Sequence, residues 1–133
     1  MKPILKPITI FSVYQSGLGE DVNRREHERT LDLLKRNGIR HMELDGVYKG
    51  QHERSILIEH GENEPEERIL IHAIAEKYSQ ESVLYSDESR KGVLIYTRTL
   101  ETQDIGQLRM LSQDEPRPDS YSVTKDGRMY VFR

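Results

Sequence analysis

Apolar and polar positions along the chain change their spacing several times, and each spacing predicts a type of element. Runs rich in β-branched and aromatic residues predict strands, and apolar residues at helical spacing predict helices. Residues 99–119 show neither spacing and are predicted to be irregular. The Asp126-Gly127 pair, between short apolar runs, predicts a final hairpin. The predicted strands span residues 8–14, 39–47, 53–59, 82–86 and 92–97, and the predicted helices span about residues 23–37 and 65–78.

The order of these elements, β-α-β-β-α-β with strands appended, is that of the ferredoxin-like arrangement. We therefore expect an α+β fold, an α/β sandwich whose antiparallel sheet carries both helices on one face. The apolar residues that alternate on the strands would leave the second face of the sheet uncovered. We expect self-association to bury that face. The length of the chain predicts one domain over residues 1–133.

Composition narrows the classes of function. Charged residues make up 32% of the chain and the net charge is −3, with acidic and basic residues interleaved. This pattern predicts no nucleic-acid groove, which needs clustered lysine and arginine. The chain has no cysteine, which excludes disulfides, thiol nucleophiles and thiolate metal sites. With no apolar run of membrane-spanning length and no signal-peptide pattern, we expect a cytoplasmic protein without membrane contact.

Candidate chemistry from the residues alone is sparse. The loop at residues 16–21, SGLGED, follows a predicted strand, but its carboxylates would repel a phosphate, which favours a simple flexible turn. The histidines lack the spacing of metal ligands, so we expect no metal site. Glu53 begins an apolar strand, where a carboxylate is expected to need a partner. Its alternative role is to protect a sheet edge from pairing with other strands.

Three segments resemble the phage enzymes that degrade S-adenosylmethionine (SAM), now described as SAM lyases and formerly as SAM hydrolases. Residues 11–27, FSVYQSGLGEDVNRREH, resemble the first strand, loop and helix of that family. Residues 46–58, GVYKGQHERSILI, resemble its Gly-x-Tyr followed by a Glu-basic-Ser strand, with a shorter loop between. Residues 80–96, QESVLYSDESRKGVLIY, resemble its closing hairpin, although Glu88 stands where the family can have glutamine.

The resemblance implies a trimer of PII-like α/β sandwiches with active sites between subunits and no cofactor. It also implies that the carboxylate of SAM attacks its own Cγ, giving 5′-methylthioadenosine and L-homoserine lactone. A phage would use this reaction in the host cytoplasm to counter SAM-dependent restriction-modification. The implied catalytic residues are Glu53 and Tyr48, and the implied substrate-binding residues are Ser16, Asn23, Gly46, Val47, Gln80 and Glu88. The alternative is a non-catalytic PII-like trimer that binds an adenine nucleotide or SAM as a sensor.

Overall fold

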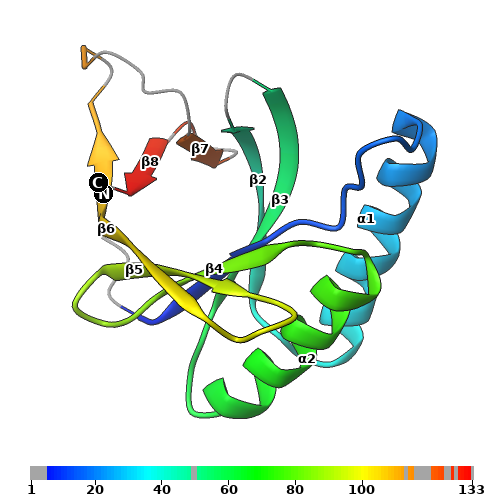
Figure 1. Cartoon of the computed structure of the whole chain (residues 1–133), viewed down its shortest axis with the longest axis horizontal. Coiled ribbons are helices and arrows are strands. Elements are labelled where there is room, and N and C mark those ends of the chain that lie inside the picture. The colour runs from blue at the N-terminus through cyan, green and yellow to red at the C-terminus, as the bar shows by residue number, and fades with distance from the viewer. Residues whose placement is uncertain are drawn as a thin grey trace.

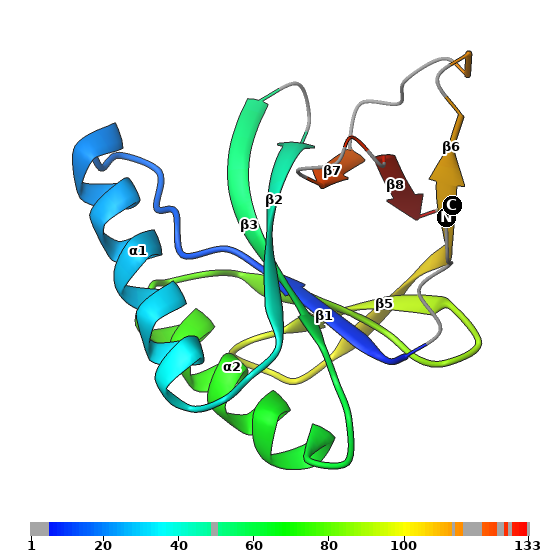
Figure 2. The ribbon, with the colours of Figure 1, turned by 180° about the vertical axis from the view of Figure 1, so that it is seen from behind.

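The computed structural model describes residues 6–48, 51–112, 114–115, 121–124, 127 and 129–132. Within these ranges there are two helices, α1 (Glu20–Arg36) and α2 (Glu64–Lys77). The strands are β1 (Ile8–Phe11), β2 (His41–Tyr48), β3 (Gln51–Glu59), β4 (Ser82–Ser86), β5 (Lys91–Tyr96), β6 (Thr102–Leu111), β7 (Tyr121–Thr124) and β8 (Met129–Phe132). Both helices lie side by side against the outside of a strongly curved sheet (Figures 1 and 2).

The described strands form a closed barrel in the order β1-β3-β2-β7-β8-β6-β5-β4. Every neighbouring pair is antiparallel, and β1 closes the barrel by pairing with β3 on one side and β4 on the other. The expected ferredoxin-like, PII-like α/β sandwich is therefore wrong. Strands β5, β6 and β8 extend the sheet from β4, and β7 extends it from β2. The two extensions meet where β7 pairs with β8. The sheet face that was expected to need self-association lines the interior of the barrel instead.

Strand β6 is the element that the sequence analysis missed, because residues 99–119 were predicted to be irregular. Most of its side chains are exposed, so it has no apolar face to reveal it. Its pairing with β5 also shifts register between Gly92 and Val93, opposite Gly106, which has a φ of 89°. Such a bulge breaks the alternation that identifies a strand. The hairpin of β7 and β8 is confirmed, although Asp126 lies outside the described residues.

The charges at the helix ends agree with the helix dipole. Helix α1 has acidic residues in its first turn and basic residues in its last, and Gly38 follows it with a φ of 66°. The predicted end of this helix at about residue 37 is thereby confirmed, since glycine adopts this left-handed conformation without strain. Helix α2 begins at Glu64, and its first turn contains Pro65 and three glutamates. Neither described helix is long and apolar enough to cross a membrane.

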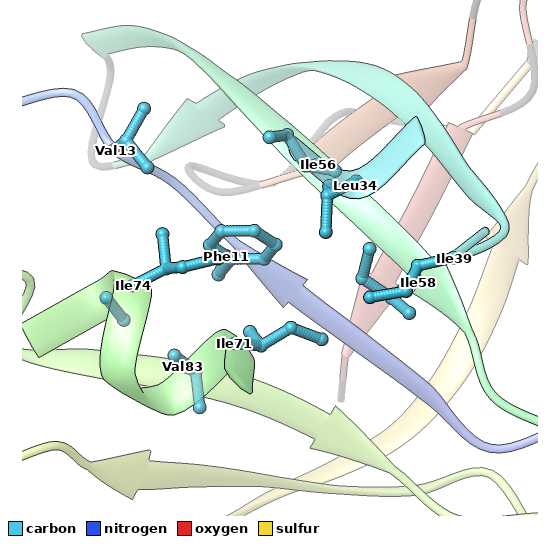
Figure 3. Close-up of a cluster of buried hydrophobic side chains, with 10 residues drawn as sticks. Phe11, Val13, Leu34, Ile39, Ile56, Ile58, Ile71, Ile74 and Val83 are labelled. Atoms are coloured by element: carbon cyan, nitrogen blue, oxygen red, sulfur yellow. The ribbon is translucent and has the colours of Figure 1, made fainter. Parts of the chain in front are cut away.

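A hydrophobic cluster holds the helices against the barrel, and its strand residues alternate with residues that face the barrel interior. On β3, Ile56 and Ile58 face the helices, whereas Leu57 belongs to a second cluster inside the barrel. Burying one such side chain contributes about 1.5–3 kcal/mol. The outer cluster, shown in Figure 3, comprises Phe11, Val13, Leu34, Ile39, Ile56, Ile58, Ile71, Ile74, Ala75 and Val83.

Candidate functional site

A cavity of about 410 Å³ lies inside the barrel, beside the first half of β3. This volume is within the range typical of small-molecule sites, roughly 300–1,000 Å³. Each strand of the described barrel contributes at least one residue to the wall. The lining residues are Ile10, Phe11, Ser12, Gly46, Val47, Glu53, Ser55, Gln80, Glu81, Ser82, Leu84, Leu94, Ile105, Tyr121, Ser122, Tyr130 and Val131.

Strand register explains why these residues meet. Gly46 pairs with Glu53 on one side and with Ser122 on the other, so these three residues share the inner face of the barrel. Ser55 lies two positions after Glu53 and therefore faces the same way. The result is an aliphatic chamber with hydroxyl groups and one carboxylate on the inner face of β3.

The described wall of the cavity carries negative charge. Glu53 is partly buried, and within the described ranges no hydrogen bond or ion pair joins its carboxylate to another residue. The described lining contains two glutamates and no lysine, arginine or histidine. A carboxylate removed from water gains most from a cationic or strongly hydrogen-bonding partner. At Glu53, β3 pairs with β2 alone, because its pairing with β1 ends at Ile56, and the Glu53 carboxylate lies on the side of the strand that faces the cavity.

Gly46 allows β2 to approach Glu53 closely. A Cβ atom at this position would lie 3.1 Å from the carbonyl oxygen of Glu53 and 3.7 Å from that of Tyr121. Both of these atoms belong to the main chain, which cannot rotate away as a side chain can. The glycine of the Gly-Val-Tyr segment therefore has a steric role beside the carboxylate.

The other predicted site residues divide into two groups. Val47 and Gln80 line the cavity together with Gly46 and Glu53. Ser16 and Asn23 do not line it: Ser16 is exposed, and Asn23 is buried against the preceding loop.

Asn23 braces that loop through its side-chain amide. Its Oδ1 accepts a hydrogen bond from the main-chain N–H of Gln15 at 2.9 Å, and its Nδ2 donates to the Gln15 carbonyl at 3.1 Å. The loop that carries Ser16 is therefore fixed to α1 at its first residue.

The two remaining predicted residues are Tyr48 and Glu88. Tyr48 ends β2, and its side chain lies outside the described residues. Glu88 is exposed in the turn after β4. Since Ser86 pairs with Ile8 at the start of β1, this turn lies at the opposite end of β1 from Ser12.

Sequence reasoning missed several residues of the cavity wall, among them Ser82, Ser122 and Tyr130. The apolar alternation in the last two strands could have indicated that Tyr130 faces inwards. Only the closure of the barrel, however, brings Ser122 beside Gly46.

Buried histidines connect the helices to the barrel. His27 Nε2 of α1 lies 2.9 Å from Glu43 Oε1 of β2, and its Nδ1 has no hydrogen-bond partner among the described residues. His60 Nδ1 lies 2.9 Å from Glu67 Oε1, and its Nε2 lies 2.6 Å from Thr9 Oγ1. In the described part of the chain, no group of three or more potential ligands is placed to hold a metal ion.

Comparison with protein families gives a match to the S-Adenosylmethionine lyase family over residues 9–133. Comparison with curated proteins gives no match. The family match includes every residue that lines the cavity, from Ile10 on β1 to Val131 on β8. With nearly the whole sequence matched, the chain belongs to the S-adenosylmethionine lyase family and is an enzyme of that class.

Proposed function

We propose that the chain degrades SAM inside the barrel by an intramolecular displacement. The family identifies SAM as the substrate and the enzyme as a lyase. In the proposed reaction, a carboxylate oxygen of SAM forms a bond to Cγ of the same molecule. The Cγ–S bond breaks, and its electron pair goes to sulfur. The products are 5′-methylthioadenosine and L-homoserine lactone, and the step consumes no water and transfers no proton.

The observation that carries this proposal is the Glu53 carboxylate, which faces a cavity without any basic residue in its described wall. SAM has a sulfonium and an ammonium group, and both are cations. Glu53 binds the ammonium or the ribose hydroxyls and thereby holds the substrate in a folded conformer. Holding the reacting atoms together can remove at best about 7–11 kcal/mol of a barrier. The aliphatic wall excludes water from charges that neutralise each other as the reaction proceeds.

We assign Tyr48 to the methionyl part of SAM, where its ring can face the sulfonium. This residue directly follows Val47, which lines the cavity. Gly46, Val47 and Gln80 supply further parts of the wall. In this proposal, these residues contact the same SAM molecule that Glu53 binds.

We further propose that the enzyme is a homotrimer whose neighbouring subunits complete each site. Ser16 and Glu88 are exposed and do not line the cavity of their own chain. As substrate-binding residues, they would have to reach SAM from another subunit. Light scattering that gives the mass of a monomer at the concentration of the activity assay would refute the trimer.

We propose a biological role in phage infection. Restriction-modification systems that depend on SAM lose their substrate when SAM is degraded. Expression of the active enzyme should lower the efficiency of such a system, whereas an inactive variant should not.

The reaction is tested by incubating the protein with SAM in ¹⁸O-labelled water and analysing the products promptly by mass spectrometry. The proposal expects 5′-methylthioadenosine and unlabelled homoserine lactone. Homoserine that carries ¹⁸O in its hydroxyl group would show that water attacks Cγ, which would refute the intramolecular displacement.

The role of Glu53 is tested with Glu53→Gln, which keeps the shape of the side chain and removes its charge. A hydrogen bond to a charged group contributes about 1.5–3 kcal/mol. We therefore expect kcat/KM to fall roughly tenfold to a hundredfold. Glu59→Gln is the matched control, because Glu59 lies on the same strand and outside the cavity. Full turnover by Glu53→Gln would refute the assignment.

A further inference from the structure

The main-chain pairing of β1 with β3 ends just before the site. The last pair is Phe11 opposite Ile56, whereas β3 continues to Gln51 and pairs there with β2. Glu53 therefore lies on a stretch of β3 that no longer pairs with β1. A strand held on one side only has more freedom to shift than one held on both sides.

Ser12 supplies the missing connection through its side chain. Its hydroxyl donates a hydrogen bond to the carbonyl oxygen of Arg54 at 2.9 Å, one residue after Glu53. Ser12 Oγ also accepts a hydrogen bond from the main-chain N–H of Tyr14 at 3.0 Å. Ser12 is 8% exposed, so water competes little for these bonds. The hydroxyl thus links the segment after β1 to the main chain beside Glu53.

This segment is held from two other directions as well. The Gln80 side chain donates from Nε2 to the carbonyl oxygen of Tyr14 at 2.5 Å, and Asn23 fixes the next residue, Gln15. The segment is thus anchored to residues near β4 and on α1. An anchored segment can hold β3 in place, whereas a loose one would follow its movements.

We propose that Ser12 is a positioning residue for the reaction, which acts by fixing the main chain next to Glu53. It directs the carboxylate towards the substrate and does not itself carry the chemistry. This inference rests on the proposed function, because it requires Glu53 to act on SAM. A purely stabilising hydroxyl would lower turnover whether or not Glu53 is present, and this difference can be measured.

The test combines Ser12→Ala with Glu53→Gln in a double-mutant cycle. A misplacement of about 1 Å can cost on the order of a hundredfold in rate. We expect Ser12→Ala to lower kcat tenfold or more in the wild-type background, with a smaller change in KM. In the Glu53→Gln background the further loss should be less than twofold, since the group being positioned is already altered. An equal loss in both backgrounds would overturn the positioning role.

Thr30→Val is the matched control for loss of a buried hydroxyl. Thr30 is 3% exposed and donates to the Glu26 carbonyl at 2.8 Å within α1, outside the cavity. This variant should lose stability but keep its turnover. If Thr30→Val lowers kcat as much as Ser12→Ala does, loss of stability explains the effect and the proposal fails.

Amide hydrogen exchange tests the contact without using activity. Loss of the Ser12 oxygen should speed exchange at the Tyr14 N–H by tenfold or more, because that donor loses its acceptor. Unchanged Tyr14 exchange would refute the connection itself. Full turnover by Glu53→Gln would instead refute the proposed function and, with it, the positioning role. The two failures are therefore distinguishable.

Discussion

Substitution of Gly46 by alanine tests the close approach of β2 to the site. The added methyl group would lie 3.1 Å from the Glu53 carbonyl oxygen, 3.7 Å from the Tyr121 carbonyl oxygen and 3.8 Å from Ser55 Oγ. Gly46 does not have a left-handed backbone, so the substitution creates no dihedral strain. The cost therefore comes from crowding alone.

Two opposing contributions set the size of the effect. Overpacking costs typically about 1–3 kcal/mol. Alanine also restricts the unfolded chain, which stabilises the protein by about 0.4–1 kcal/mol. We expect Gly46→Ala to lower the free energy of unfolding by about 0.5–2 kcal/mol. Because the methyl group displaces the main chain of Glu53, kcat/KM should fall as well.

Urea unfolding of Gly46→Ala and of Gly61→Ala measures this contribution. A Cβ atom at Gly61 would have no atom within 4 Å, so that variant keeps only the stabilising contribution. Gly61→Ala should therefore be as stable as the wild type or slightly more stable, with an unchanged denaturant slope. If Gly46→Ala unfolds at the same urea concentration as Gly61→Ala, the wall around Gly46 is soft and the steric argument is wrong.

Three further predictions concern other parts of the molecule. Burial, with a hydrogen bond to a neighbouring carboxylate, raises the pKa of Tyr85 from 10.0 to about 12. The resulting contribution to the free energy of unfolding is present below about pH 10 and is lost as pH rises towards 12, and Tyr85→Phe should weaken this loss in urea unfolding measured at several pH values. A hydrogen bond from Ser89 holds the pKa of Asp87 below its usual value, and Ser89→Ala should raise that pKa in a carboxyl NMR titration; an unchanged pKa would contradict this cause. Ile71 is 1% exposed and Ile69 is 72% exposed, so Ile71→Ala should lower the free energy of unfolding in urea by about 2–5 kcal/mol and Ile69→Ala by less than about 0.5 kcal/mol. Equal losses would contradict the assigned core.

The sequence was sufficient for elements whose side chains carry a clear period. The Ile56-Leu57-Ile58 run predicted β3, and the stripe that contains Ile71 and Ile74 predicted α2. Strand β6 has few buried residues, chiefly Leu108 and Leu111, so its apolar residues were too sparse to predict a strand. Because β6 joins β5 to β8, missing it changed a closed barrel into an open sheet.

The candidate site was predictable to a similar extent. Glu53 could be selected because an acid at the start of an apolar strand needs an explanation, and Gly46, Val47 and Gln80 followed from the family resemblance. Ser122 and the other C-terminal lining residues could not be selected, because their place depends on pairing between β2 and β7. No local pattern encodes a contact between segments so distant in the sequence.

The cavity wall includes residues from both ends of the chain, so the enzyme can become active only late in its synthesis. Residues as early as Ile10 and as late as Val131 line the same chamber. A chain still on the ribosome, with β7 and β8 inside the exit tunnel, can form both helices but has no complete chamber. Its sheet would end in unpaired edges at β2 and β6, which can pair with other chains. Translation must therefore deliver the last hairpin before SAM can be consumed, and a chain truncated before β7 should be both inactive and prone to aggregation.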